Sequence, residues 1–129
     1  MSQNPEPRLS RLQIAVLRII WRRGEATVAE VWKDLQATRA LAATTVATLL
    51  KRLEARGAVA HRTSGRQYVY RALLEEERVA STMTNELVED LYEGDVAGLF
   101  AHLLDPNRVT QDDLTRIKSM IRDAEDGPH

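Results

Sequence analysis

Cysteine is absent from the 129-residue sequence, which excludes disulfides, thiolate metal sites, thiol redox chemistry and cysteine nucleophiles. Aromatic residues make up only 5% of the chain, so any hydrophobic core must be mostly aliphatic. Long hydrophobic runs are also missing, because the longest uncharged run, residues 40–50, is too short and too rich in threonine to span a bilayer. No apolar signal core follows Met1, so we expect a cytoplasmic protein without membrane insertion.

The residue patterns of common catalytic and metal sites are absent as well. His61, His102 and His129 lie far apart in the sequence and share no metal-ligand spacing. No glycine-rich phosphate loop, nucleophile elbow or His-Glu-x-x-His motif occurs. The acidic run at residues 75–77 is typical of the first turn of a helix, where carboxylates interact favourably with the helix dipole. We therefore predict no enzyme activity, no metal site and no cofactor.

Charged residues divide the chain into a basic and an acidic half, although the formal net charge is only −1. Residues 8–72 hold 13 lysines and arginines against 4 acidic residues, whereas residues 73–129 hold 5 against 14. A basic half joined to an acidic half suggests a polyanion-binding module fused to a segment that does not bind polyanions. Two differently solvated surfaces would produce the same counts of charged residues. The order of residues within the basic half must therefore decide between these two interpretations.

Three amphipathic helices are predicted in the basic half. The segments from Ser10 to Gln13 and from Thr27 to Glu30 each form a capping box that starts a helix. A third helix is expected over residues 43–56, with Gly57 as its left-handed C-cap. Three short helices in this length require a compact tri-helical core, formed by Val16, Leu17, Ile20, Trp21, Val28, Val31, Trp32, Leu35, Val46, Leu49, Leu50 and Leu53.

After Gly57 the hydrophobic period changes from that of a helix to that of a strand. Residues 59–62 and 67–71 are predicted strands, and residues 63–65 fit a three-residue hairpin loop with Gly65 at its left-handed position. Three helices followed by a basic hairpin is the element order of a winged helix-turn-helix. We therefore predict a mostly α fold with a small β-hairpin, in which a flexible N-terminus (1–8) precedes a winged-helix head (9–72).

The outward face of the third helix and the hairpin favour DNA binding. Short hydroxyl side chains near a helix N-terminus approach phosphates and base edges closely, and arginine binds guanine or phosphate. Threonine clusters are often local caps and basic hairpins are often merely solvated, but both features in this order favour DNA. The candidate DNA-binding residues are Thr44, Thr45, Thr48, Lys51, Arg52, Arg62 and Arg66.

The acidic half is predicted to be a helical dimerisation arm over residues 73–122, followed by a flexible tail at 123–129. Three helices without a sheet bury their apolar stripes poorly within one chain, so we expect a symmetric homodimer. Folding of these stripes back onto the head is the alternative. A dimer would present two basic heads to half-sites about one helical turn apart. The candidate interface residues are Leu87, Leu91, Val96, Leu99, Phe100, Leu103, Leu114, Ile117 and Ile121.

Three segments of the chain resemble the penicillinase repressor family (BlaI/MecI, with the copper-responsive CopY relatives). They are residues 9–21, residues 41–57 (LAATTVATLLKRLEARG) and the wing at residues 65–70 (GRQYVY). The resemblance implies a homodimeric winged-helix repressor that binds a palindromic DNA operator. It also implies that the recognition helix carries Thr44, Thr45, Thr48 and Arg52, and that the wing carries Arg62 and Arg66.

Two departures from the family concern the inducing signal. Antibiotic-responsive members are cleaved in the arm at an Asn-Phe bond, and the matching position here is His102-Leu103. Copper-responsive members carry a C-terminal cysteine cluster, which this chain lacks, so copper sensing through thiolates is excluded. One expected way to end repression is cleavage of the His102-Leu103 bond by a signalling protease, which releases the repressor from its operator. The alternatives are a repressor gated by a small ligand and a winged helix used as a protein-interaction module.

Overall fold

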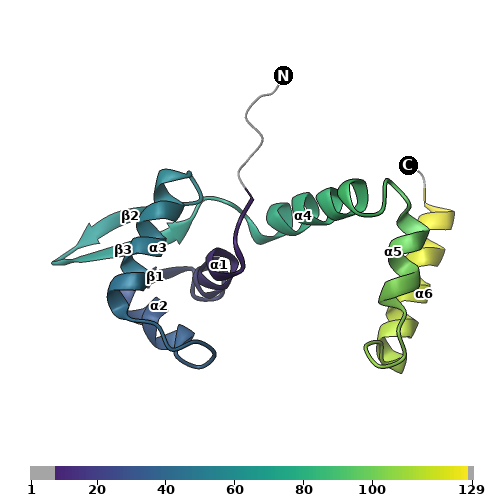
Figure 1. Ribbon diagram of the computed structural model, residues 1–129, viewed down its shortest axis with the longest axis horizontal. Coiled ribbons are helices and arrows are strands. Elements are labelled where there is room, and N and C mark those ends of the chain that lie inside the picture. The colour runs from purple at the N-terminus through teal and green to yellow at the C-terminus, as the bar shows by residue number, and fades with distance from the viewer. Residues whose placement is uncertain (1–7, 128–129) are drawn as a thin grey trace, which may run out of the picture. The chain divides into compact units, whose positions relative to one another are not determined.

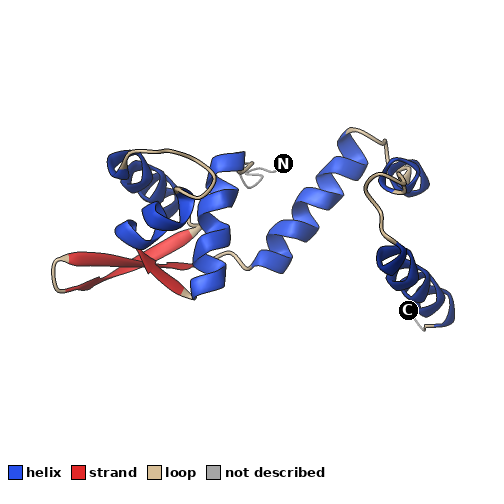
Figure 2. Cartoon of the chain, turned by 90° about the horizontal axis from the view of Figure 1, so that it is seen from below, coloured by secondary structure: helices blue, strands red, loops and turns tan. Residues whose placement is uncertain are grey.

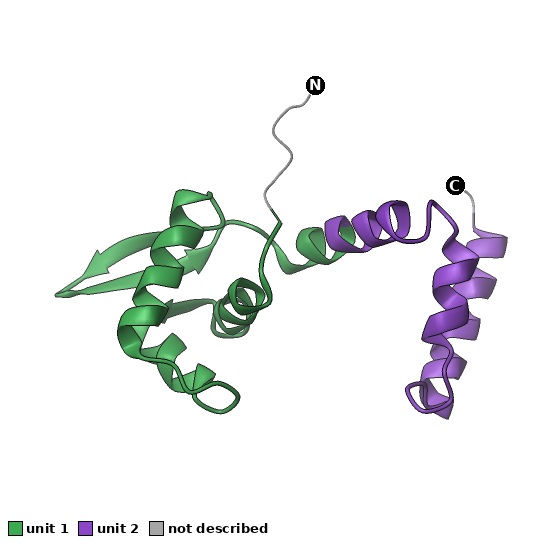
Figure 3. Cartoon of the chain, viewed as in Figure 1, with its two compact units in different colours: residues 1–81 green, residues 82–129 purple. Residues whose placement is uncertain are grey.

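The computed structural model describes residues 8–127, and the chain divides into two compact units, residues 1–81 and 82–129 (Figure 3). Helices predominate and the strands form one small sheet, which confirms the predicted mostly α fold (Figure 2). In chain order the elements are α1 (Arg11–Arg23), β1 (Glu25–Thr27), α2 (Val28–Leu35), α3 (Ala43–Ala55), β2 (Val59–Ser64), β3 (Gln67–Ala72), α4 (Glu76–Asp90), α5 (Val96–Leu103) and α6 (Gln111–Asp126) (Figure 1).

The predicted capping boxes of α1 and α2 are confirmed. The Ser10 hydroxyl accepts a hydrogen bond from the Gln13 amide at 3.1 Å, and the Gln13 side chain accepts one from the Ser10 amide at 3.0 Å. Thr27 and Glu30 form the same reciprocal pair at the start of α2. These side chains satisfy backbone N–H groups that have no partner within the helix, so the sequence locates both helix starts.

The C-terminus of α3 is closed by a Schellman motif that directs the chain into the wing. Gly57 has a φ of +82°, the left-handed conformation predicted for it. Its amide donates to the Glu54 carbonyl at 3.0 Å, and the Ala58 amide donates to the Leu53 carbonyl at 2.9 Å. The last carbonyls of α3 are thereby satisfied, and β2 begins directly after this turn.

The sheet has the strand order β1-β3-β2, with β3 antiparallel to both neighbours. Ser64 pairs with Gln67, so the hairpin loop is Gly65-Arg66, and the predicted three-residue loop at 63–65 is wrong. Gly65 has a φ of +62° whereas Arg66 is not left-handed, the arrangement of a type II′ turn. Because this turn matches the twist of the strands, Thr63 and Ser64 continue β2, and the hairpin projects beyond the helices (Figures 1 and 2).

Strand β1 was not predicted. Its middle residue Ala26 pairs with Tyr70 in β3 and is fully buried. Three residues are too few to show the alternation that identifies a strand. The pairing of β1 is evident only in the tertiary structure, where β3 lies next to it.

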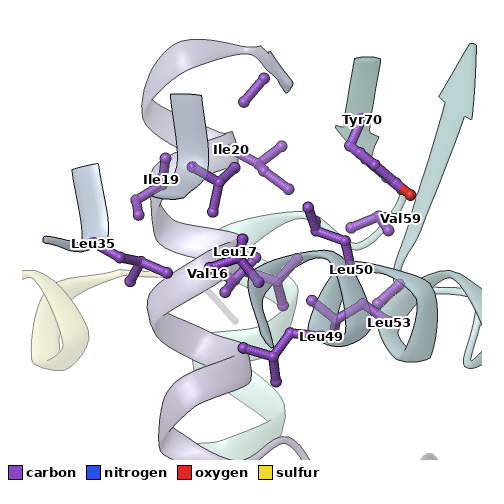
Figure 4. Packing of buried hydrophobic residues seen from close by; sticks show 14 residues of the cluster. Val16, Leu17, Ile19, Ile20, Leu35, Leu49, Leu50, Leu53, Val59 and Tyr70 are labelled. Carbon is purple, nitrogen blue, oxygen red and sulfur yellow. The ribbon is translucent and has the colours of Figure 1, made fainter. Parts of the chain in front are cut away.

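The core lies between the three helices and one face of the sheet (Figure 4). The Tyr70 side chain enters it from β3, and Trp21 and Val28 lie at its margin. Trp32 was predicted to be buried but is 37% exposed, because its indole N–H donates to the Leu41 carbonyl at 2.7 Å, outside the core. The largest fully buried side chains are Val16, Leu17, Ile20, Val31, Leu35, Val46, Leu50, Leu53, Val59 and Tyr70.

The boundary between the two units falls within α4, after Ser81, rather than after residue 72 as expected. Leu74 packs against the core of the first unit, and its carbonyl accepts a hydrogen bond from the Trp21 indole at 2.9 Å. The segment after β3 therefore belongs with the head. A bilayer-spanning helix is not found among residues 8–127.

The described residues reach into both ends of the chain that were expected to be flexible. Helix α6 begins at a capping box formed by Thr110 and Asp113 and continues to Asp126, whereas the arm was expected to end at residue 122. The Gly127 amide donates to the Asp123 carbonyl at 2.8 Å and closes the last turn. At the other end, the Arg8 carbonyl accepts a hydrogen bond from Arg56 at 2.7 Å. Residues 1–7 and 128–129 lie outside the described residues.

Candidate nucleic-acid interface

The residues predicted to contact DNA from the third helix all lie exposed on α3. Successive residues of a helix are rotated by about 100°, so a buried stripe leaves the opposite side to solvent. Val46, Leu49, Leu50 and Leu53 form the buried stripe of α3. The exposed side of the helix carries Thr44, Thr45, Thr48, Lys51 and Arg52.

The N-terminus of α3 is placed by its surroundings rather than by a capping side chain. Ala42 stands at the N-cap position and makes no side-chain hydrogen bond. Instead, the Leu41 carbonyl accepts hydrogen bonds from the Trp32 indole N–H at 2.7 Å and from the side-chain amide of Gln36 at 3.0 Å. Thr48, one turn into the helix, donates to the Thr44 carbonyl at 3.0 Å. The positive end of the helix dipole thus lies next to short, exposed side chains.

The two wing arginines occupy different environments. Arg66 lies exposed in the hairpin turn and has no ion-pair partner among residues 8–127. Arg62 instead forms a bidentate pair with Glu25, through Nη2 to Oε1 at 2.9 Å and Nε to Oε2 at 3.2 Å. This hydrogen bonding lowers the pKa of the Glu25 carboxyl and raises that of the Arg62 guanidinium from their ordinary values. The sequence predicted equal roles for the two arginines, whereas the structure distinguishes them.

A cluster of three side chains joins α3 to the wing. The His61 Nδ1 atom lies 2.7 Å and 2.8 Å from the two carboxylate oxygens of Glu54. The His61 ring also stacks on Tyr68, with ring centroids 3.9 Å apart and an angle of 14° between the planes. Burial raises the pKa of the neighbouring Tyr70 hydroxyl, and Glu54 adds to the rise. The sequence showed His61 only as a histidine without metal-ligand spacing, and it did not predict this cluster.

A groove of about 460 Å³ lies between the start of α2, the exposed side of α3 and the wing. Small side chains such as Ala43 and Ala47 line it, and Lys51 and Arg66 contribute cations from α3 and from the hairpin turn. Gln67 and Tyr68 complete the wing side. Alanine has no functional group that marks it as part of a binding site, so the sequence did not predict that these small residues line a groove.

In the second unit, part of the predicted dimer interface is exposed within the single chain. Leu87, Leu91, Val96, Phe100 and Ile121 expose large apolar surface. The exposed fractions of these five side chains range from 40% to 68%. The other predicted residues are less available, because Leu99 is buried and Leu103, Leu114 and Ile117 are half-buried.

His102 lies exposed in the last turn of α5, next to the bond proposed for cleavage. Its Nδ1 atom is 3.0 Å from the Tyr92 hydroxyl, and the two rings are 5.7 Å apart. Residues 8–127 contain no cluster of histidine and acidic side chains suited to a metal ion.

Comparison with known proteins identifies the family. The penicillinase repressor family matches residues 9–123, which is nearly the whole chain. The chain belongs to the penicillinase repressor family. This is a family of DNA-binding transcriptional repressors and not of enzymes, and the resemblance stated from the sequence is confirmed.

Two members of the penicillinase repressor family show how far the sequences have diverged. The penicillinase repressor of Bacillus licheniformis is 22% identical over 117 residues, which cover 91% of each chain. The methicillin resistance regulatory protein MecI of Mammaliicoccus sciuri is 20% identical over 113 residues, covering 88% of this chain and 92% of the relative. The similarity therefore extends through both units at low identity.

Solved structures of the same family confirm the fold of the head. The solution structure of the DNA-binding domain of the repressor BlaI is 30% identical, with a TM-score of 0.52, and covers 59% of this chain and 93% of that domain. The monomeric form of Bacillus licheniformis BlaI in complex with the blaP half-operator is 31% identical, with a TM-score of 0.50. The match covers 57% of this chain and 90% of that chain. The predicted winged-helix fold is thereby confirmed.

Proposed function

We propose that this protein is a homodimeric transcriptional repressor that binds a palindromic operator through α3 and the wing. The observation that carries the proposal is the arrangement of the exposed α3 residues beside a groove bounded by Lys51 and Arg66. A related repressor, BlaI of Bacillus licheniformis, has been solved in complex with a half-operator. No residue of the proposed interface needs a cofactor.

Each part of the interface has a distinct task in this proposal. Helix α3 enters the major groove, where Thr44, Thr45 and Thr48 are short enough to allow close approach and Arg52 reads a base edge. Lys51 and Arg66 bind phosphates on either side of the groove. The small side chains between them leave room for the sugar–phosphate backbone of one strand.

The second unit supplies dimerisation. Exposed apolar surface of this extent in a small unit marks an interaction site, and a second copy of the same chain would cover it symmetrically. Two linked heads bind two half-sites with an effective concentration far above that of free monomers. The dimer therefore supplies most of the affinity for the full operator.

The first test is a gel shift with the DNA upstream of the protein's own gene, repeated over a series of salt concentrations. We expect a sequence-specific shift whose logarithmic salt slope reports the number of neutralised phosphates. An unrelated duplex of equal length is the control for specificity. Absence of any shift at low salt, together with capture of a protein partner, would overturn the proposal in favour of a protein-interaction module.

We propose cleavage of the His102-Leu103 bond as the event that ends repression. The bond lies in the final turn of α5, so cleavage would separate α6 from the rest of the chain. Mass spectrometry of the protein from penicillin-treated cells should detect a fragment ending at His102. Derepression with an intact chain would reject cleavage. Release of the purified protein from its operator by a small molecule would then support ligand gating.

A further inference from the structure

The Glu25–Arg62 pair spans the outer face of the sheet. Glu25 in β1 pairs with Arg71 of β3, and Arg62 in β2 pairs with Val69 of β3. Side chains alternate along a strand, and Tyr70 between these two positions points into the core. Glu25 and Arg62 therefore share the face turned away from the core and meet across β3, although they are 37 residues apart in the sequence.

This pair contributes little to folding. The side chains of Arg62 and Glu25 are 57% and 46% exposed, and ion pairs exposed to this extent have small effects on stability because water screens them. Residues 8–127 contain no buried side-chain N or O atom that lacks a hydrogen-bond partner. Its main effect is therefore on the availability of the Arg62 charge.

The acidic residues of the head differ in the basic side chains that they contact. Glu30 and Asp34 both contact Arg23, and Glu54 contacts His61. Within the described part of the head, Glu25 is thus the one acid whose ion pair holds a cation predicted to bind DNA. The N–H groups of Arg62 that Glu25 holds are those that would bind a phosphate in the same forked geometry.

Building on the proposed function, we infer that Glu25 limits the affinity of the repressor by competing with DNA phosphate for Arg62. When DNA binds, Arg62 exchanges the carboxylate for a phosphate, so it gains less than an arginine without a partner. The exchange also leaves the Glu25 carboxylate near the DNA backbone, with Arg71, its register partner in β3, as the cation that still acts on it. Since phosphate contacts are independent of sequence, Glu25 weakens binding to every duplex and leaves base preference unchanged.

The test is a double-mutant cycle on Glu25→Gln and Arg62→Ala, with dissociation constants measured by fluorescence anisotropy. Glu25→Gln keeps the size of the side chain and removes its charge. We expect about two- to fivefold tighter binding to both the operator and an unrelated duplex, within the range for one exposed charge contact. In the Arg62→Ala background the same substitution should have little effect.

Asp34→Asn is the matched control. It also removes one negative charge from an exposed ion pair, here with Arg23 on α1, which is not predicted to contact DNA and which keeps its contact with Glu30. Its effect on affinity should therefore be small. Circular dichroism melting of each variant will establish that the fold is retained.

Three results would overturn the inference. Weaker binding by Glu25→Gln would show that the pair holds the wing in a productive position. Unchanged binding would show that Arg62 does not exchange partners. A gain that persists in the Arg62→Ala background, or that Asp34→Asn reproduces, would show a general charge effect. If the wild-type protein shifts no duplex at all, it is the proposed function that fails.

Discussion

The Glu54 carboxylate lies 2.7 Å from Nδ1 of His61 and thereby links the last turn of α3 to β2 of the wing. The stacking of His61 on Tyr68 extends this link to β3. Helix α3 and the hairpin are also joined by the short turn at residues 56–58 and by the core, where Leu50 and Leu53 belong to the same buried cluster as Tyr70. The pair therefore restrains the angle between the two elements proposed to bind DNA.

Replacing His61 should loosen the wing without unfolding the head. We expect His61→Ala to accelerate amide hydrogen exchange in β2 and β3 near the hairpin turn, because the contact with Glu54 and the stacking on Tyr68 are both lost. The cost to global stability should be about 1 kcal/mol or less, since the pair is partly exposed. Amides of α1 serve as an internal control, and unaltered exchange in the hairpin would contradict this role.

Arg52 is expected to contribute to base recognition. Arg52→Ala should weaken binding to the specific site by about 1–3 kcal/mol and relax the preference at one base position. The measurement is anisotropy with the operator and with single-base variants of it. Arg18→Ala, which removes an exposed arginine from α1, is the matched control. Unchanged operator affinity would show that this side of α3 does not face the major groove.

Arg66 is expected to act on phosphate alone. Because the hairpin turn presents it without an ion-pair partner among the described residues, Arg66→Ala should weaken binding to all duplexes alike. The logarithmic salt slope should become shallower by about one. A slope equal to that of the wild-type protein would exclude a phosphate contact at this position.

Leu91 offers the clearest test of the dimer. It is 68% exposed in the single chain, so Leu91→Glu should prevent dimerisation without disturbing the protomer. Sedimentation velocity should show a monomer that still binds half-operator DNA but loses affinity for the full operator. Glu89→Gln, in the last turn of α4 just before Leu91, should remain dimeric. A dimer of Leu91→Glu would refute the interface, whereas Leu99 is unsuitable because it is already buried at 8% exposure.

The start of α6 should depend on pH through Asp113. The Thr110 amide and hydroxyl contact this carboxylate and lower its pKa below the ordinary value. A carboxyl whose pKa is depressed in the folded state stabilises the helix above the unfolded pKa, and the effect is lost as the pH falls through the folded value. The Thr110 amide resonance should therefore titrate below about pH 4. A midpoint above that range, or the same titration in Asp113→Asn, would contradict the assignment.

Local features of this protein were predictable from its sequence. The capping boxes at Ser10 and Thr27, the left-handed Gly57 and the exposed face of α3 depend on residues within one or two helical turns of one another. Such interactions are set by backbone geometry and by the spacing of apolar residues. The hairpin was also predictable, but its loop length was not, because a turn signal does not specify the register of the strands that it joins.

The tertiary structure decided which of the predicted DNA-binding cations are available. Glu25 reaches Arg62 only because β1, which the sequence did not reveal, pairs with β3 on the side opposite β2. The same packing brings His61 to Glu54 and joins the wing to α3. The sequence determined the chemistry of each side chain and the helix on which it lies. The sheet register determined which opposite charges meet, because that depends on pairing between segments far apart in the chain.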